Sequence, residues 1–461
     1  MGSERAETFK LASEINKIGR TLRQMRFQRS AIYFLAFVLP PLSVGVTLAL
    51  MSMSEVMVHK EPAALSAKLP APLARKNGNA LAEILLGANG TQLTELMAPA
   101  EILGETGSID LRTVALERKL LPTTGEISIL PDYDYANSPV ADILIIPSIL
   151  ESEDSATLNF IRERAPKAKW ILTLGEGARL AAKAKLVEGK KATTHFMAFD
   201  DLKKTYPATL WTWGPPFITD GNIISSQGIT ASIEATLELV AQFRSREDAV
   251  KIREKLKISP FAFREEPKPE LKISDVLRLM MNAGYDWNKL TIGTLLYPGV
   301  SELGIASLLD SLPRTQNLRV FSISDRRAFV YSAHGLALVP TEAISDSIHA
   351  DYVAVPSSGQ SEIAEPKIFN AWVGTNGIHL KTFQTVAPGQ AFAGALGWIA
   401  ELEDNSSMAH LVGKFIGIPA TPEKGSAVSA LWLRPFLVGL LGLLLCYFIF
   451  RRKDAAKKHS I

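Results

Sequence analysis

The sequence predicts an α/β protein in which two tandem units with parallel sheets lie between two transmembrane helices. Three observations support this fold class. Two segments of more than 20 residues are almost free of charge, short apolar runs alternate with helical patterns between them, and blocks from the first half of that region recur in the second. The chain has 461 residues, which is enough for two or three domains that each bury a sizeable core.

The two apolar segments, residues 31–53 and 430–450, have the length of membrane-spanning helices. The first contains no charged residue, and the second contains only Arg434, close to one end. A helix needs about 20 apolar residues to cross the hydrocarbon core of a bilayer. Arg434 can extend to the membrane interface, and Pro40-Pro41 should kink the first helix without ending it. We therefore expect membrane lipid to be a partner of both helices.

Charge on either side of these segments predicts their orientation. Residues 1–30 carry seven Lys and Arg against three Asp and Glu, and residues 451–461 carry five against one. Cytoplasmic flanks of membrane helices are enriched in basic residues. We therefore expect a bacterial inner-membrane protein with both termini in the cytoplasm and its main domains in the periplasm. The basic ends are typical of contacts with lipid head groups, and we expect no nucleic-acid partner.

Residues 1–30 also contain an apolar stripe at helical spacing, which predicts a basic amphipathic helix on the membrane surface. The stripe consists of Leu11, Ile15, Ile18, Leu22 and Met25. Self-association through the stripe is the alternative, although fewer than three heptads is short for a coiled coil. For residues 31–53 the alternative is a cleaved signal peptide, but the apolar run is too long for one and Ala49-Leu50-Met51 is a poor cleavage site.

The region between the membrane segments combines strand-like and helix-like patterns. Residues 54–80 are rich in Ala, Pro and Lys, which predicts a linker. After it, apolar runs such as Ala141–Pro147 alternate with helical patterns such as Thr91–Leu103, as in a parallel sheet covered on both faces. The only cysteine, Cys446, lies in the second membrane segment, so the exported region has no disulfide and no thiol nucleophile.

An internal repeat divides this region into two copies. ADILIIPS at Ala141–Ser148 recurs as ADYVAVPS at Ala350–Ser357, and Ile129-Leu130-Pro131 matches Leu338-Val339-Pro340 at the same offset of 209 residues. Nearby, AEILLGANGTQLTEL resembles IGTLLYPGVSEL at Ile292–Leu303. Matches in one order at nearly one offset indicate tandem copies of a single α/β unit. We place them at residues 81–257 and 289–420, joined by a linker and a helix at 258–288.

Four sequence blocks carry a resemblance to a known family. They are Thr94–Gly104, Ile129–Pro147, Ala178–Phe196 and Asp220–Val240. In this order and spacing they resemble the PfpI family of the class I glutamine-amidotransferase-like superfamily, most of all the ligand-sensing domain of AraC-type regulators. The resemblance covers about 40% of the chain, and it implies a flavodoxin-like sandwich. The second copy is degenerate, and the helix-turn-helix of AraC-type regulators is missing.

The same resemblance implies where the family chemistry would lie. It places a glutamate at Glu95, a histidine at His195 and the nucleophilic cysteine, on a turn between a strand and a helix, at Gly175. Glycine has no side chain that can attack a substrate. The Gly-Gly pair that donates backbone N–H groups to an oxyanion in the family is Ser148-Ile149 here. Both departures predict a pseudoenzyme without hydrolase or glyoxalase chemistry.

Several interpretations of the vestigial site residues remain open. Glu95 and His195 are expected as a buried hydrogen-bonded pair, or as the lining of a small-molecule pocket together with Glu176 on the turn. A metal site of Glu95, Glu176 and His195 lacks a visible fourth ligand, so we expect no metal and no cofactor. Ser148 as a replacement nucleophile has no base placed beside it by any motif. The other histidines, His334 among them, are scattered without ligand spacing.

Trp211, Trp213 and Phe217 belong to a cluster of aromatic residues and prolines before Asp220-Gly221. A loop packed over the sheet edge is one interpretation of this cluster. A surface that contacts a protein partner is the other, because exposed aromatic residues make good interface anchors.

Three functions from different classes fit the sequence. The first is an inactive membrane-anchored scaffold or assembly component whose tandem domains pack on each other and bind protein partners, in a homo-oligomer or a larger membrane complex. The second is a membrane-tethered sensor that binds a small-molecule ligand in the vacated pocket. The third is a residual hydrolase or glyoxalase-like enzyme that uses Glu95 and His195. Gly175 argues against the third, and we expect the scaffold.

Overall fold

The computed structural model describes residues 17, 24, 27–51, 69–150, 155–259, 268–346, 348–358, 367–402, 406–418 and 433–458. These residues fall into two units, which are described separately. One unit lies within residues 54–275 and 288–427 and contains all the strands, and the other combines the terminal helices with residues 276–287. All five residues of the apolar stripe predicted in residues 1–30 lie outside the described residues.

The first half of the larger unit contains a sheet of seven strands. In spatial order they are β10 (Phe217–Asp220), β11 (Ile223–Ser226), β7 (Trp170–Thr173), β6 (Ile143–Ile146), β1 (Ala80–Leu85), β2 (Ile109–Ala115) and β5 (Tyr133–Asp134). All neighbours pair in parallel except β10 and β11, which are antiparallel. The central strand β6 reads ILII and is buried throughout, as expected of a parallel strand covered on both faces.

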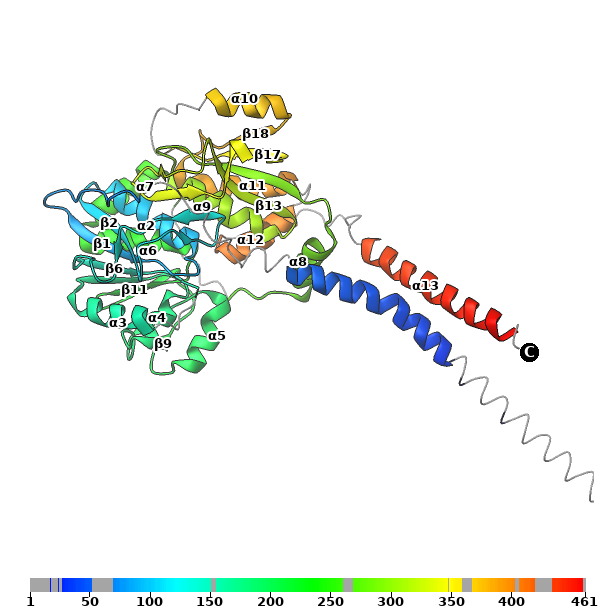
Figure 1. Ribbon diagram of the computed structural model, residues 1–461. Coiled ribbons are helices and arrows are strands. Elements are labelled where there is room, and N and C mark those ends of the chain that lie inside the picture. The colour runs from blue at the N-terminus through cyan, green and yellow to red at the C-terminus, as the bar shows by residue number, and fades with distance from the viewer. Residues whose placement is uncertain are drawn as a thin grey trace, which may run out of the picture. The chain divides into compact units, whose positions relative to one another are not determined.

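Six helices accompany this sheet (Figure 1). They are α2 (Leu93–Glu105), α3 (Ser155–Arg164), α4 (Gly177–Lys183), α5 (Phe196–Thr205), α6 (Ala231–Phe243) and α7 (Arg246–Leu256), with a short ladder of β8 (Lys191–Ala192) and β9 (Leu210–Trp211) and a 3-10 turn, η1 (Ala165–Lys167). Side chains of α3, α4 and α5 share one core with the sheet, whereas α2 and α6 pack against each other. The predicted α/β layering of the first copy is therefore confirmed.

The second half contains a parallel sheet of five strands. In spatial order they are β16 (Glu342–Ala343), β13 (Leu318–Ser324), β12 (Leu290–Leu295), β17 (Tyr352–Val355) and β18 (His379–Thr382). Its helices are α9 (Glu302–Ser311), α10 (Lys367–Asn376), α11 (Ala391–Leu402) and α12 (Ser406–Ile416), with η2 (Leu312–Thr315), η3 (Ile344–Asp346) and η4 (Pro388–Gln390). This strand order is the same as β5-β2-β1-β6-β7 of the first sheet.

The two halves meet through corresponding elements. Helix α2 packs on α9, and β4 (Ile127–Ile129) pairs antiparallel with β15 (Ala337–Pro340) in a small sheet that also contains β3 (Leu121–Pro122) and β14 (Val330–Tyr331). Ile129 lies directly opposite Leu338, and these are the two positions matched by the sequence repeat. The α2–α9 and β4–β15 contacts therefore join the two halves of this unit.

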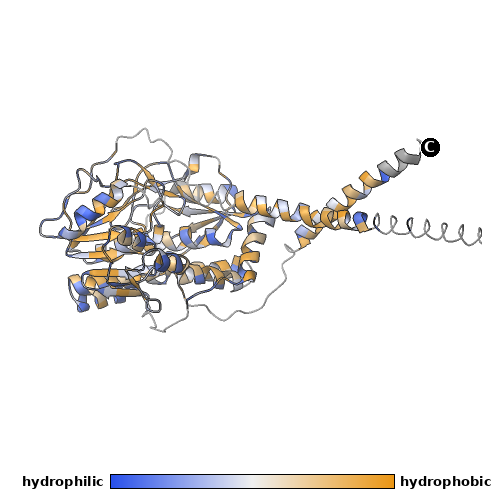
Figure 2. Cartoon of the chain, turned by 90° about the horizontal axis from the view of Figure 1, so that it is seen from below, coloured by the Kyte–Doolittle hydropathy of each residue, from blue (hydrophilic) through white to orange (hydrophobic). Residues whose placement is uncertain are grey.

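The smaller unit contains two helices that are long and apolar enough to cross a membrane, by length and composition. They are Phe27–Met51 and Leu433–Arg452, the latter part of α13 (Leu433–Lys458), and Figure 2 shows both as predominantly hydrophobic. The first helix continues through Pro40 and Pro41. A Cβ added at Gly442 would overlap the carbonyl oxygen of Ala36, so the two helices approach closely at this glycine. Tyr285, the last residue of helix α8 (Ile273–Tyr285), contacts both: its hydroxyl group donates to the Pro41 carbonyl oxygen, and its own carbonyl oxygen accepts from Arg434.

Candidate functional site

The predicted elbow is present between β7 and α4. The chain leaves β7 after Thr173, turns at Gly175 with φ +49°, and enters α4 at Gly177. A positive φ of this kind favours glycine, because a Cβ would crowd the backbone. A Cβ at Gly177 would overlap the carbonyl oxygen of Ile146, so α4 begins in direct contact with the end of β6. The turn therefore has a left-handed backbone at Gly175 and a close strand–helix contact at Gly177, both of which require glycine.

The carboxyl group of Glu95 fills the space that a side chain at position 175 would need. A Cβ built on Gly175 would overlap Oε1 of Glu95 and lie 2.8 Å from Oγ of Ser148. Two backbone donors hold the carboxyl group there: the N–H of Ser148 donates to Oε2 at 2.7 Å, and the N–H of Ile229 donates to Oε1 at 3.2 Å. Burial raises the pKa of Glu95 to about 7, and these hydrogen bonds oppose the rise.

His195 lies at the N-terminus of α5 but does not contact Glu95. Its Nε2 lies 3.2 Å from the carbonyl oxygen of Phe415, a residue of α12 in the second half. Burial lowers the pKa of His195 to about 4, so the ring is neutral at pH 7. The expected hydrogen-bonded pair of Glu95 and His195 is therefore wrong. The reason is that backbone N–H groups already bind the Glu95 oxygens, while the second half supplies the acceptor for His195.

The second half also covers the edge of this site. The hydroxyl and N–H groups of Thr230 both donate to the carbonyl oxygen of Ile416 at the end of α12. On α9, the carboxylate of Asp310 accepts hydrogen bonds from Gln92 and from Thr94, the latter at 2.5 Å. Glu95 is only 1% exposed. The Glu95 carboxyl group thus lies inside the elbow, and residues of the second half cover the edge of this site.

Ser148 and Glu176 have structural contacts that explain their positions. The N–H of Glu176 donates to Oγ of Ser148 at 2.7 Å, which ties the elbow to the end of β6. Ser148 Oγ lies 3.5 Å from the Leu174 carbonyl oxygen, and neither of these contacts provides a base that could activate the hydroxyl. The carboxylate of Glu176 lies 3.3 Å from Arg179. Glu95, Glu176 and His195 are therefore not brought together as metal ligands in the described structure.

The aromatic cluster is mainly packed inside the protein. Trp211 is 8% exposed, and its indole N–H donates to the carbonyl oxygen of Tyr206 at 3.0 Å. Trp213 packs edge-on against Phe199, with ring centroids 5.6 Å apart. The partner-surface interpretation is thus wrong for Trp211, because its ring fills the core beside the sheet and gives the β8–β9 strands their packing. Trp213 and Phe217 are half-buried.

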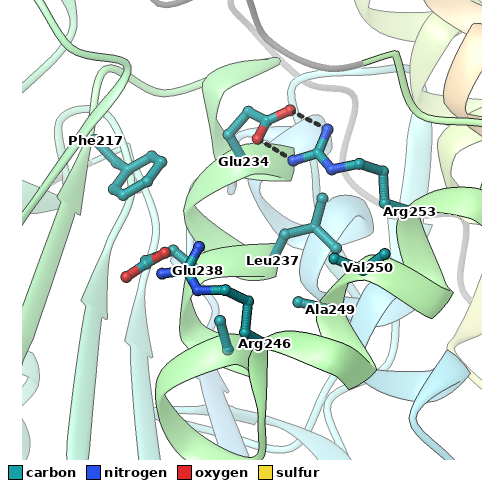
Figure 3. Close-up of a pocket in the computed structure, with 9 residues that line it drawn as sticks. Phe217, Glu234, Leu237, Glu238, Arg246, Ala249, Val250 and Arg253 are labelled. Carbon is teal, nitrogen blue, oxygen red and sulfur yellow. Dashed lines mark hydrogen bonds and ion pairs between the residues drawn. The ribbon is translucent and has the colours of Figure 1, made fainter.

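Phe217 lines a pocket of about 300 Å³ formed by β10, α6 and α7 (Figure 3). Arg253 and Glu234 form an ion pair with two hydrogen bonds on one side of the pocket, and Nη1 of Arg253 lies 2.9 Å from Oε1 of Glu234. Glu238 and Arg246 lie at the other side of the pocket. These elements are not those of the elbow, so the pocket is separate from the vestigial site.

A second group of ionisable residues escaped prediction from the sequence. Glu101 of α2, Glu302 of α9 and His334 between β14 and β15 lie together where the two halves meet. His334 belonged to the histidines without ligand spacing. One signal in the sequence does point to Glu302, because the repeat aligns Thr94-Glu95-Leu96 with Ser301-Glu302-Leu303.

The pKa of His195 gives a testable pH dependence. In the unfolded chain His195 binds a proton below its ordinary pKa of 6.5, whereas in the folded chain it does so only below about pH 4. Stability should therefore fall as pH drops from 6.5 to 4, by up to about 3 kcal/mol from this group. Chemical unfolding of the wild type and of His195→Gln at about pH 7.5, 6.5, 5.5 and 4.5 measures the contribution of His195. The raised pKa of Glu95 makes stability rise as pH drops, so the relevant quantity is the difference in unfolding free energy between the two proteins at each pH. If this difference does not change with pH, the lowered pKa of His195 is contradicted.

Comparison with known proteins agrees with the elbow and the sheet. A sequence model of the DJ-1/PfpI family matches residues 82–242. An isonitrile hydratase from Pseudomonas putida is 28% identical over 175 residues, which is 37% of this chain and 75% of the hydratase. The HTH-type transcriptional regulator CdhR from Pseudomonas aeruginosa is 38% identical over 86 residues, which is 18% of this chain and only a quarter of the regulator.

Among solved structures, a ThiJ/PfpI family protein from Pseudomonas syringae is similar at 23% identity and a TM-score of 0.38, over 40% of this chain and 77% of that one. The sequence matches fall on the region that carries β1, the elbow and α6. Residues 82–242 of this chain therefore form a DJ-1/PfpI family domain.

Proposed function

We propose that the chain is a catalytically inactive, membrane-anchored scaffold that presents its DJ-1/PfpI domain and its second α/β half for protein–protein interaction. The observation that carries this proposal is the position of the Glu95 carboxyl group, which occupies the space of a side chain at Gly175. A nucleophile at the elbow is missing, and the space it would use is filled. We assign neither the hydratase activity nor the regulator activity of these relatives to this chain.

The remaining polar groups of the site also support inactivity. An acyl-transfer or hydration site needs free donors aimed at a developing negative charge. Here the Ser148 N–H donates to Glu95. A general base must reach its substrate, but Glu95 is buried and His195 is bound to the Phe415 carbonyl. The same contacts argue against a small-ligand sensor at this position, because Glu95 Oε1 occupies the position of a side chain at Gly175.

We further propose that the second half is a degenerate copy of the same domain. Its sheet has the strand order of the first, its Ser301 caps α9 where the aligned Thr94 lies in the first turn of α2, and the two halves pair through matched positions. A family-type dimer interface thus lies within the chain. Outward surfaces of this pair remain for other proteins, in a homo-oligomer or a larger membrane complex.

The smaller unit supports anchoring in a membrane. The helices Phe27–Met51 and Leu433–Arg452 each have a mean hydropathy of 2.1 and are largely unburied. Val276 and Leu277 of α8 add exposed apolar side chains to the same unit. Arg434 bonds to the carbonyl oxygen of Tyr285 and lies 3.3 Å from Asp286, as expected for a charge held at an interface. The basic ends favour an inner-membrane protein with cytoplasmic termini and periplasmic domains.

An activity assay tests the inactive-scaffold proposal. Purified full-length protein should show no turnover of esters, peptides, methylglyoxal or isonitriles above a buffer blank. Turnover that is abolished by Glu95→Gln and kept by Glu176→Gln, an exposed neighbour, would contradict the proposal. A saturable thermal shift with a small molecule, lost in His195→Ala, would favour the sensor instead. Purification in mild detergent should give a particle larger than one chain.

A labelling experiment tests the orientation separately. In a Cys446→Ser background, Lys203→Cys on the exposed side of α5 should react with a membrane-impermeant maleimide once the outer membrane is opened. Ser30→Cys, at the start of the first apolar helix, should react only after the inner membrane is lysed. The reverse pattern, or equal labelling of both, would contradict the proposed topology.

A further inference from the structure

A buried cluster of charged side chains lies at the junction of the two halves. Glu101 projects from α2, Glu302 from the first turn of α9, and His334 from the loop between β14 and β15. Both glutamates are fully buried, and the His334 side chain is 17% exposed. Such a group inside a protein needs its charges matched, because isolated buried charges are costly.

The donor atoms of this cluster converge on one place. Oε2 of Glu302 lies 3.0 Å from Nδ1 of His334, and Oε1 accepts the His334 backbone N–H at 2.8 Å. Oε2 of Glu101 accepts from Ser301 Oγ at 2.8 Å and from the Leu303 N–H at 2.9 Å. One oxygen each from Glu101 and Glu302 and one ring nitrogen of His334 all lie within 4.8 Å of one another.

One oxygen in this cluster has no partner. Oε1 of Glu101 is buried and makes no hydrogen bond among the described residues. Leaving a charged buried acceptor unsatisfied costs more than a neutral one, so such atoms are rare in folded proteins. Burial and the nearby carboxylate of Glu302 raise the pKa of Glu101 to about 8. A proton on Glu101 or a bound cation would satisfy this oxygen.

Carboxylates surround His334 and raise the pKa of its ring to about 10, so the ring would release a proton on binding a metal ion. Its Nδ1 faces Glu302, while its Nε2 lies 3.6 Å from Oε1 of Glu105, which also pairs with Lys255. In metal sites a ligating imidazole usually directs its other nitrogen at a carboxylate, which fixes the ring and its tautomer. Glu105 stands in that position. A Cβ at Gly104 would overlap the imidazole, so the glycine lets the ring lie against α2.

We propose that Glu101, Glu302 and His334 bind a divalent transition-metal ion, with Zn²⁺ the ion that suits two carboxylates and one imidazole. Zinc accepts both oxygen and nitrogen ligands and makes few geometric demands, so this donor set suits it. Ions that prefer oxygen alone, such as Mg²⁺ and Ca²⁺, fit less well. Because the ligands come from α2 on one side and from α9 and the following loop on the other, the ion would fasten the two halves together.

Zinc content of the full-length protein in detergent tests this site. After chelator treatment and reloading with ZnCl₂, we expect one zinc per chain by elemental analysis and a higher melting temperature. Glu101→Gln and Glu302→Gln should each weaken zinc binding by at least tenfold. Glu105→Gln should weaken it by roughly 10- to 100-fold, as for other partners of a ligating histidine. Glu234→Gln, which alters a partly buried carboxylate elsewhere, is the matched control and should bind zinc as the wild type does.

A second measurement keeps the proposal testable if a variant fails to fold. X-ray absorption of the zinc-loaded wild type should show oxygen and nitrogen ligands at about 2.0–2.1 Å, with one imidazole and no sulfur. Absence of stoichiometric zinc would overturn the proposal and leave a proton on Glu101 as the explanation. Binding that persists in both glutamine variants, or a zinc–sulfur distance, would also overturn it by placing the ion elsewhere.

Discussion

Replacing Gly175 with alanine should destabilise the DJ-1/PfpI domain by about 4 kcal/mol, because two costs combine at this position. The backbone adopts φ +49°, which costs an L residue about 1–2 kcal/mol. The new Cβ would also overlap Oε1 of Glu95. Displacing that carboxyl group breaks its hydrogen bonds to the backbone N–H groups of Ser148 and Ile229, at about 1–3 kcal/mol for a buried group. Chemical unfolding of the full-length protein in detergent measures the loss.

Two comparisons separate these costs. Gly189 has φ +71° with no atom within 4 Å of an added Cβ, so Gly189→Ala should cost only the backbone term, about 1 kcal/mol. A double-mutant cycle provides the second comparison. In a Glu95→Ala background, Gly175→Ala should cost much less than it does in the wild type, because the overlapping carboxyl group is gone and only the Ser148 hydroxyl group remains close to the new Cβ. Equal losses for Gly175→Ala and Gly189→Ala in the wild type would show that Glu95 does not fill the elbow.

Asp310→Ala should destabilise the contact between the two halves by about 3 kcal/mol. The Asp310 carboxylate is 4% exposed. It accepts hydrogen bonds from Gln92 and Thr94 of the first half and from Arg314 of its own half, the last at 2.7 Å. Removing it leaves a guanidinium group and two polar side chains without their acceptor, and breaking a partly buried ion pair in this way is strongly unfavourable. A lower melting temperature and faster proteolysis between the halves would record the loss.

An exposed ion pair provides the control for this experiment. Glu247 and Lys251 lie one helical turn apart on α7, both well exposed, at 2.7 Å. Pairs of this kind contribute little to stability, so Glu247→Ala should leave the melting temperature nearly unchanged. Asp310→Asn keeps one acceptor oxygen and should lie between the wild type and Asp310→Ala. If Asp310→Ala behaves as Glu247→Ala does, the α2–α9 contact does not depend on this carboxylate.

Local sequence patterns predicted much of the first sheet and its elbow. The apolar run ADILIIP became β6, and the helical pattern at Thr91–Leu103 became α2, which begins two residues later. The resemblance to the PfpI family points to Gly175 as the elbow residue, and the structure places it in a left-handed turn. These features depend on periodicity, turn chemistry and short spacings, all of which are visible within a few tens of residues.

Contacts between the halves could not be predicted from the sequence. His195 and Phe415 are 220 residues apart, and nothing in either segment indicates that a carbonyl group would replace Glu95 as the partner of the histidine. Glu101 and His334 are likewise brought together only by the packing of α2 on α9. Propensity and spacing describe single elements, whereas such contacts depend on how complete elements pack.

The pairing of β4 with β15 has a consequence for stoichiometry and evolution. In a symmetric homodimer every side chain at the interface occurs twice, so a change on one side is repeated on the other. Fusion of two copies, as proposed above for this chain, would remove that constraint, and here Glu101 contacts Ser301 while Asp310 contacts Thr94. Each chain would therefore expose one copy of each side of the paired halves, and the two sides differ. A protein that recognises one side would dock once per chain and in one direction, which gives an assembly built from this subunit an inherent polarity.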